Sequence, residues 1–139
     1  MADSQKKIIL FIDDDEDDFL LLRDIFEECR DDIDLQWVKD SEQAIDRLTR
    51  SGADRPSFIL LDLNMPKLNG HEVLAQIRQR DALRDVPVAV LTNSINRNEV
   101  QEAYRLGVNS FLRKPSGYTE LREFAKTFCR YWFDYSTLS

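Results

Sequence analysis

The stretch FILLDLNMP at positions 58–66 is the part of the chain that decides the fold. Four apolar residues run directly into Asp62, and the run lies between Pro56 and a turn region that contains Pro66 and Gly70. A short apolar run bounded by turn residues is typical of a strand buried on both faces, as in a parallel sheet covered by helices. Ligands of such sheets bind outside the carboxyl ends of the strands, so we expect Asp62 at the edge that carries the site.

This segment alone leaves two interpretations of Asp62 open. A carboxylate at a strand end is a candidate nucleophile or metal ligand. Aspartate is also common in turns, where its side chain accepts hydrogen bonds from the following backbone. The residues that follow the other strands distinguish between these two interpretations.

Strand-like and helical segments alternate along the whole chain. Strands are predicted at residues 7–12, 34–38, 58–61, 88–91 and 110–112, and apolar residues at helical spacing follow each one. These helical faces contain Phe19, Leu22, Ile25 and Phe26; Ala44, Ile45 and Leu48; Val73, Leu74 and Ile77; Val100, Ala103 and Tyr104; Leu121, Phe124, Ala125, Phe128 and Trp132. The pattern predicts an α/β fold, a doubly wound five-stranded parallel sheet with five helices and right-handed crossovers.

Length and composition indicate one folded domain. The chain has 139 residues with 42% hydrophobic content, which is sufficient for one core, and we expect a single domain over 1–139 with its core at about 7–133. The formal net charge is −7 and many of the acids precede residue 35. We therefore expect no nucleic acid as a partner, because binding to phosphates needs a basic stripe that this sequence lacks.

The cysteines and the apolar runs bear on the compartment. Cys29 and Cys129 lack metal-ligand spacing, which favours reduced thiols. No apolar run approaches the roughly 20 residues of a membrane span, and the N-terminus has no signal-peptide apolar region. We expect a cytoplasmic protein that has no membrane partner.

Polar side chains follow four of the five predicted strands. The acidic run 13–18 follows the first strand, Asp62 the third, residues 92–94 (Thr-Asn-Ser) the fourth, and Lys114 comes after the fifth. Because parallel strands end at the same edge of a sheet, these groups are expected to meet.

That set of groups suits phosphoryl transfer to a carboxylate. Two carboxylates about 4 Å apart repel by on the order of 4 kcal/mol at an effective dielectric constant near 20, and a hard divalent cation such as Mg²⁺ relieves this repulsion. Asp14 and Asp62 would be its side-chain ligands. Asp62 could then accept a phosphoryl group as a mixed anhydride, with Lys114 and Thr92 stabilising the charge on its oxygens.

Each of these residues also has an ordinary structural interpretation. The acidic run could begin a helix, with Asp15 as the N-cap and residues 16–18 favoured by the helix dipole. Thr92 could form a loop hydrogen bond, and Lys114 could be a solvated surface charge. Their joint placement at one edge favours the site, and Asp13 and Asp14 can serve it while the later acids serve the helix.

Four separated motifs resemble the receiver domain of two-component response regulators. They are residues 12–15 (IDDD), residues 62–66 (DLNMP) followed by Asn69-Gly70, residues 91–94 (LTNS), and Lys114-Pro115. They occur in the family's order and span nearly the whole chain. The resemblance implies a flavodoxin-like receiver fold and a histidine kinase as the partner that donates a phosphoryl group.

The resemblance also implies the residues of the metal site. Asp62 corresponds to the phosphoacceptor and Asp13 and Asp14 to the acidic pair. Mg²⁺, or Mn²⁺ in its place, would be held by Asp14, Asp62 and the main-chain carbonyl of Asn64, with Asp13 acting through a water molecule.

The switch residues follow from the same resemblance. Thr92 and Lys114 correspond to the phosphate-binding switch residues, and Phe111 to the aromatic switch that moves when Thr92 is drawn toward the phosphate. The Lys114–Pro115 bond is expected to be cis. Asn93 stands where many receivers have Ala or Gly, and its larger side chain would restrict phosphodonors or attacking water.

A narrower similarity concerns single-domain regulators paired with bacterial phytochrome histidine kinases. It rests on residues 91–96, on residues 108–110 and on the closing segment from Tyr131 to Leu138. It implies a stand-alone receiver without an output domain. We also expect a homodimer through the fourth helix, the fifth strand and the fifth helix, with Phe128 contributing to the core instead.

Two other classes of function remain open. One is a binding adaptor with a receiver fold that acts without phosphorylation. The other is a haloacid-dehalogenase-like phosphatase, whose signature has a second aspartate two residues after the nucleophile. Asn64 occupies that position here and cannot act as a general acid. We therefore expect a signalling protein rather than an enzyme, with chemistry limited to its own phosphorylation and dephosphorylation.

Overall fold

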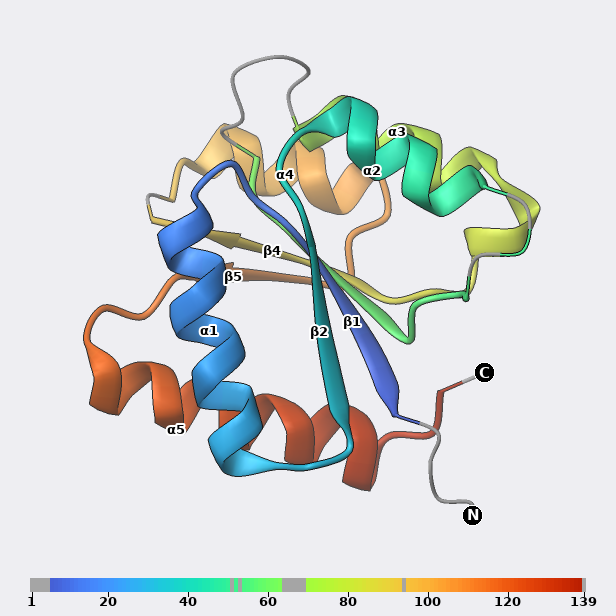
Figure 1. Cartoon of the computed structure of the whole chain (residues 1–139). Helices are drawn as coiled ribbons and strands as arrows, with labels where there is room; N and C mark the ends of the chain where they lie inside the picture. Colours follow the sequence, from blue (N-terminus) through green and yellow to red (C-terminus); the bar gives the residue numbers. More distant parts are fainter. Residues whose placement is uncertain (1–5, 51, 53, 64–69, 94, 139) are drawn as a thin grey trace.

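A computed structural model describes residues 6–50, 52, 54–63, 70–93 and 95–138 (Figure 1). Its strands are β1 (Lys7–Ile12), β2 (Ile33–Val38), β3 (Phe58–Leu61), β4 (Val88–Thr92) and β5 (Ser110–Arg113). Its α-helices are α1 (Glu16–Cys29), α2 (Ser41–Thr49), α3 (Gly70–Gln79), α4 (Arg97–Arg105) and α5 (Tyr118–Cys129). A 3₁₀ turn covers Asp81–Leu83, and α5 continues as a π-helical segment, Arg130–Tyr135.

The five strands form one parallel sheet in the order β2-β1-β3-β4-β5. Helices α1 and α5 cover one face and α2, α3 and α4 cover the other (Figure 1). The predicted α/β fold, the parallel sheet and the five helices are confirmed. The strand bounds differ from the prediction by at most one residue: β2 begins at Ile33, β4 ends at Thr92 and β5 ends at Arg113.

Alternate residues of the central strands enter two separate cores. Leu10, Ile59 and Val90 face the core of α2, α3 and α4, whereas Phe11 and Leu60 face the core of α1 and α5. All four residues of β3 are fully buried, because both faces of that strand are covered. Burial on both faces explains why β3 is a continuous apolar run rather than an alternating one.

Aromatic rings fill the core beneath α5. Phe128 is 4% exposed, so its predicted place in the core is confirmed. Its ring lies edge-on to Phe58, with a centroid distance of 4.7 Å, and Trp132 contacts the same Phe58 ring at 4.9 Å. Trp132 lies in the π-helical segment and not in α5, so the α-helical part of the last helix ends earlier than the apolar spacing predicted.

One arginine joins three segments where the strands begin. The guanidinium of Arg78, near the end of α3, donates to the carbonyls of Val86 (2.8 Å) and Gly107 (3.0 Å) and to the Asn109 side chain (3.0 Å). It also donates to the carbonyls of Leu83 and Arg84. These bonds tie α3 to the turn before β4 and to the loop before β5.

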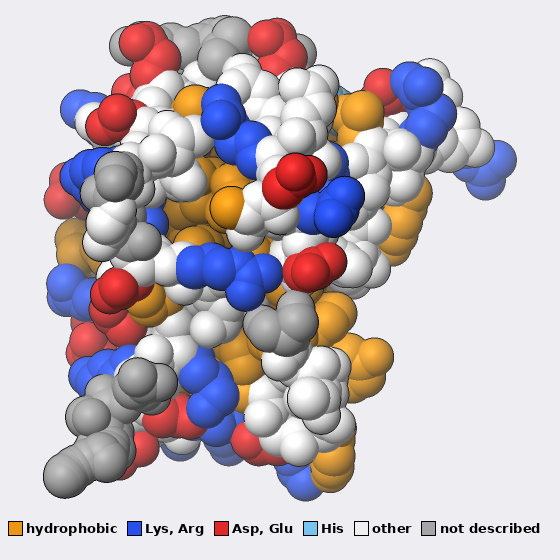
Figure 2. Space-filling view, turned by 90° about the vertical axis from the view of Figure 1, so that its right-hand side faces the viewer, with side chains coloured by type: hydrophobic (Ala, Val, Ile, Leu, Met, Phe, Trp, Pro, Cys, Tyr) orange, Lys and Arg blue, Asp and Glu red, His pale blue; other side chains and the backbone are white. Residues whose placement is uncertain are grey.

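A chain of ion pairs joins both ends of the protein to α1. Arg30 donates to both oxygens of Asp32 (2.8 and 2.7 Å) and both of Asp134 (3.0 and 3.1 Å), and Lys7 pairs with Asp32 at 3.2 Å. The hydrogen bonds from Arg30, which have the larger effect, and from Lys7 hold the pKa of Asp32 well below its usual range. Figure 2 views the molecule from the side at which the sheet begins, and there positive and negative side chains are interspersed.

The described residues include no helix long and apolar enough to cross a membrane. Cys29 is half-buried, Cys129 is buried, and neither forms a disulfide, as predicted.

Candidate functional site

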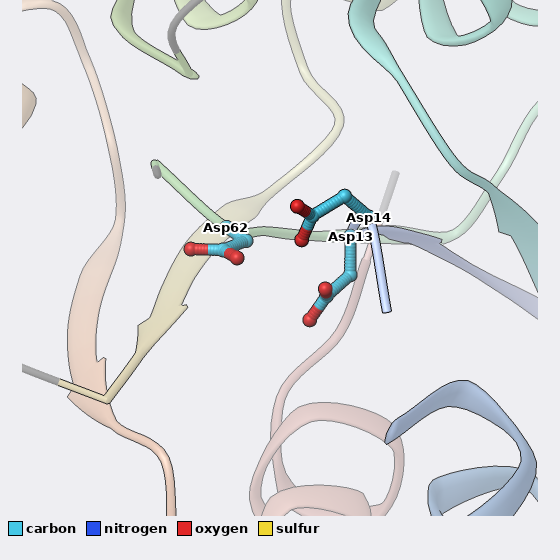
Figure 3. A group of neighbouring side chains, drawn as sticks. All are labelled: Asp13, Asp14 and Asp62. Carbon is cyan, nitrogen blue, oxygen red and sulfur yellow. The ribbon is translucent and has the colours of Figure 1, made fainter. Parts of the chain in front are cut away.

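The ends of β1 and β3 bring three carboxylates together. Asp13 and Asp14 directly follow β1, and Asp62 follows β3. The backbone N–H of Asp62 donates to the carbonyl of Ile12 at 2.9 Å, so the two strand ends are fixed side by side. Carboxylate oxygens of all three residues lie within 4.8 Å of one another (Figure 3).

Burial makes this arrangement electrostatically costly. Asp13 is 1% exposed and Asp62 8%, whereas Asp14 is open to solvent. Burial raises the pKa of Asp13 to about 6, and the nearby charge of Asp62 adds to the rise. The backbone N–H of Asp15 and the Lys114 ammonium oppose it with hydrogen bonds. The hydrogen bonds therefore only partly offset what burial and the neighbouring charge cost the Asp13 carboxylate.

Lys114 reaches the cluster from the end of β5. Its Nζ donates to Oδ2 of Asp13 at 2.9 Å and to Oδ2 of Asp18 at 2.8 Å, and its side chain is 11% exposed. Burial alone would lower the pKa of Lys114, but the hydrogen bonds to Asp18 and Asp13 raise it above its ordinary value. The ammonium is thus held charged beside the three carboxylates.

The Lys114–Pro115 bond is trans, since the described residues contain no cis peptide bond. The expected cis bond is therefore wrong for this structure. The trans isomer is favoured for an X–Pro bond, and the long lysine side chain reaches the carboxylates from it. The backbone N–H of Lys114 donates to the carbonyl of Thr92 at 2.6 Å, which joins the ends of β4 and β5.

The other predicted switch residues lie on β4 and β5 or next to them. Thr92 is 1% exposed at the end of β4. Phe111 is half-buried on β5 and packs against the core of α2, α3 and α4. Asn93 is exposed and lines a small cavity of about 240 Å³ that Lys114 also lines. Asn64, the predicted carbonyl ligand, lies outside the described residues, as does Ser94 of the LTNS motif.

Gly70, the first residue of α3, lies close to the backbone of Asp62 and Leu63. Its N–H donates to the carbonyl of Leu63 at 3.2 Å. A Cβ at this position would lie 2.7 Å from Cα of Leu63 and 2.9 Å from the carbonyl oxygen of Asp62. Only glycine allows α3 to begin this close to the backbone of Asp62.

Two residues at the site were not predicted from the sequence. The sequence predicts Asp18 only as part of the helix start, but the residue pairs with Lys114. Its spacing with Leu22 and Ile25, both buried, could have revealed that it faces inward. The indole N–H of Trp37 donates to the carbonyl of Asp13 at 2.8 Å while its ring stacks on Phe19. Only the pairing of β1 with β2 brings Trp37 there, and no local sequence signal indicates it.

The donor set fits a small divalent cation. Carboxylate oxygens are the ligands that Mg²⁺ and Mn²⁺ prefer, and both ions tolerate one or two carboxylates with water completing the shell. The three carboxylates carry more negative charge than Lys114 neutralises, and the exposed Asp14 leaves a path from solvent. The predicted Mg²⁺ or Mn²⁺ is therefore compatible with the residues present.

Comparison with known sequences identifies relatives over nearly the full length. The "Probable methanogenesis regulatory protein FilR2" of Methanothrix harundinacea is 35% identical over 132 residues, which cover 93% of this chain and 85% of the relative. "Response regulator Rcp1" of Synechocystis is 35% identical over 136 residues, covering 95% of this chain and 92% of Rcp1.

Solved structures agree with the fold. The phosphorylated cyanobacterial phytochrome response regulator RcpA has a TM-score of 0.88 at 32% identity, covering 96% of this chain and 98% of RcpA. The Mn²⁺-bound form of Rcp1 has a TM-score of 0.85 at 35% identity, covering 96% of this chain and 99% of Rcp1. Residues 9–126 match the response regulator receiver domain, a span that contains β2 to β5, all but the first two residues of β1, and the three carboxylates. The chain belongs to the response regulator receiver family of two-component signalling proteins.

Proposed function

We propose that this protein is a cytoplasmic response regulator that accepts a phosphoryl group from a sensor histidine kinase on Asp62. The observation that carries the proposal is the grouping of Asp62 with Asp13 and Asp14 within 4.8 Å, beside the ammonium of Lys114. An Asp62 oxygen attacks the phosphorus of a phosphohistidine, the P–N bond breaks, and its electron pair stays on the imidazole nitrogen. The product is an acyl phosphate on Asp62.

Each residue at the edge has a part in this step. Asp14, Asp62 and the Asn64 carbonyl would hold Mg²⁺ or Mn²⁺, with Asp13 acting through water. The cation supplies charge stabilisation for the transferring phosphoryl oxygens. Lys114 and the hydroxyl of Thr92 bind the remaining phosphoryl oxygens, and Asn93 limits the access of other phosphodonors and of water.

The readout of phosphorylation is a change of the surface built by α4, β5 and α5. Thr92 moves toward the phosphoryl group, and the half-buried Phe111 moves into the space that it leaves. A groove of about 690 Å³ lies on the β5 and α5 part of this surface, lined by Leu112, Pro115, Phe124, Tyr131 and Trp132 among others. β5 is an edge strand of the sheet. Tyr131 is 56% exposed and Tyr104 is 50% exposed. A second copy of the chain would cover these apolar groups, so we propose a homodimer there.

The relatives suggest the class of kinase. RcpA is a cyanobacterial phytochrome response regulator, and it resembles this chain over nearly the full length of both proteins. We therefore propose a phytochrome histidine kinase as the phosphodonor. Phosphotransfer from a phosphorylated phytochrome kinase should be faster than from an unrelated sensor kinase at equal concentration. Equal or slower transfer would contradict the pairing while leaving the receiver function intact.

The test of the phosphoacceptor is labelling by acetyl phosphate or phosphoramidate with Mg²⁺, read by intact mass. Wild type should gain one phosphoryl group, and Asp62→Asn should gain none. Asp24→Asn is the matched control, because Asp24 is an exposed acid of α1 with 61% of its side chain accessible. If neither small donors nor a kinase labels the wild type and beryllofluoride does not bind, the adaptor function replaces this proposal. Turnover of small phosphate esters would indicate a phosphatase.

The homodimer is tested by light scattering after size exclusion, before and after phosphorylation. Phe124→Glu should lower the mass to that of a monomer, because it places a charge in the groove. Leu21→Glu is the control, since Leu21 is an exposed apolar residue of α1 outside the groove. A wild-type protein that remains monomeric at micromolar concentration in both states would disprove the dimer.

A further inference from the structure

Lys114 has two carboxylate partners, and only one of them belongs to the acidic group around Asp62. Asp13 lies in that group, together with Asp14. Asp18 lies in the first turn of α1 and is not one of the three grouped acids, although its Oδ2 is as close to Nζ (2.8 Å) as that of Asp13 (2.9 Å). The ammonium is therefore shared between the phosphorylation site and a helix beside it.

The local sequence explains why Asp18 points at the lysine. Asp15 caps α1, and its side chain accepts from the backbone N–H groups of Asp17 and Asp18. The helix therefore begins with its register fixed, and Asp18 shares one face with the buried Leu22 and Ile25, at spacings of four and seven residues. Asp17 points elsewhere and is exposed. The two neighbouring acids thus have the same charge but different relations to Lys114.

We propose that Asp18 is a positioning residue that competes with the phosphoryl group for Lys114. The inference rests on the proposed function, in which Lys114 binds a phosphoryl oxygen on Asp62. The unphosphorylated protein commits two of the three N–H donors of the Lys114 ammonium to Asp13 and Asp18, and both carboxylates attract the positive charge that a phosphoryl oxygen would also attract. On phosphorylation, Lys114 exchanges the bond to Asp18 for one to the phosphoryl oxygen and keeps its neighbour Asp13.

Space and exposure favour Asp18 as the bond that is given up. Asp18 and Lys114 both line the cavity of about 240 Å³ between α1 and the segment after β5, so the ammonium has room to move. The Asp18 side chain is 35% exposed, whereas that of Asp13 is 1% exposed. Water can solvate Asp18 when the lysine leaves, but the buried Asp13 would lose the ammonium that offsets its charge at a place where little water can replace it. The exchange therefore costs least at Asp18.

The experiment compares the affinity of the full chain for beryllofluoride and for Mg²⁺ in wild type and three variants. Tryptophan fluorescence reports both, because the Trp37 indole lies against the carbonyl of Asp13. Asp18→Asn removes the competing charge, and Asp17→Asn removes an equal charge from the same helical turn without touching Lys114. Asp18→Glu restores a carboxylate. Urea midpoints establish that each variant is folded, and Asp18→Ser serves in place of Asp18→Asn if that variant unfolds.

Asp18→Asn should bind beryllofluoride on the order of three- to fivefold more tightly than wild type, the scale of a partly exposed ion pair. The effect of Asp17→Asn on beryllofluoride affinity should be less than about half that of Asp18→Asn. Asp18→Glu should have an affinity close to that of wild type. The Mg²⁺ affinities of Asp17→Asn and Asp18→Asn should be equal, because neither residue belongs to the grouped carboxylates.

Two outcomes would overturn the inference while leaving the proposed function in place. In the first, wild type binds beryllofluoride, but Asp17→Asn and Asp18→Asn change its affinity for beryllofluoride equally. That result would mean that only the total charge of the helical turn matters. The other is tighter binding of Mg²⁺ and beryllofluoride to the same degree in Asp18→Asn, which would mean a general rearrangement. Absence of beryllofluoride binding by wild type would instead overturn the proposed function itself.

Discussion

The two edges of the sheet treat charge in opposite ways. Where the strands end, Asp13, Asp14 and Asp62 are crowded together and the pKa of Asp13 is raised to about 6. Where the strands begin, Arg78 donates to five oxygen acceptors, and in the ion-pair chain the pKa of Asp32 is held low. The first edge retains electrostatic repulsion that a cation can relieve, and the second stabilises the scaffold that holds the repelling groups together.

The largest change should come from Arg78→Met. This substitution keeps an apolar stem but removes the donors to the carbonyls of Val86 and Gly107 and to Asn109, so the free energy of unfolding should fall by about 2–3 kcal/mol. Urea unfolding measures it. Arg84→Met is the control, since the Arg84 side chain is 68% exposed with one long ion pair, and it should stay within about 0.5 kcal/mol of wild type. Equal losses in the two variants would mean that Arg78 does not hold the edge together.

A smaller and opposite effect is expected for Asp62→Asn in metal-free buffer. The variant removes a charge that helps to raise the pKa of Asp13, so it should be more stable than wild type by about 1 kcal/mol at pH 7.5. Because the folded pKa of Asp13 lies above its ordinary value, wild type should lose stability as the pH rises from about 4 through about 6. This loss should shrink in the variant.

Magnesium should reverse that order. At ten times its Kd, Mg²⁺ should stabilise wild type by about 1.4 kcal/mol and Asp62→Asn by much less. The melting temperature measured with and without Mg²⁺ tests this. A wild-type protein whose stability does not respond to Mg²⁺ would remove the contrast between the two edges.

The smallest effect is the acid response of Asp32. Its pKa is lowered in the folded protein, so its contribution is present above the ordinary value of 3.8 and is lost as the pH falls toward the folded value. Between pH 5 and pH 2, wild type should lose about 0.5 kcal/mol more than Asp32→Asn, a figure on the scale of partly exposed pairs. Parallel curves for the two proteins would mean that the ion pairs of Arg30 add nothing measurable.

Local sequence patterns predicted the fold and the position of the carboxylates. The apolar run of β3 is buried on both faces, as its composition indicated, and Asp15 caps α1. Because parallel strands share one edge, finding Asp62 and Lys114 after different strands was sufficient to predict that both lie at the edge where the strands end. These features depend on burial and on strand direction, which the sequence encodes residue by residue.

Contacts between distant segments could not be predicted in this way. The partners of Arg78 are backbone carbonyls, which every residue has, so no side-chain pattern marks them. Trp37 reaches the Asp13 carbonyl only because β2 pairs with β1. The isomer of the Lys114–Pro115 bond depends on the surrounding tertiary structure, since the two forms of an X–Pro bond differ by about 1 kcal/mol or less. The expectation taken from the family was therefore wrong here.

The buried thiol at the end of α5 can report how often this helix separates from the sheet. Cys129 is fully buried, and burial raises the pKa of its thiol to about 12, so it should be protected from thiol reagents while α5 is packed on the sheet. Cys29, at the end of α1, is half-buried and should react first. The rate at which Cys129 is subsequently modified then reports how often α5 separates from the sheet, without any added probe.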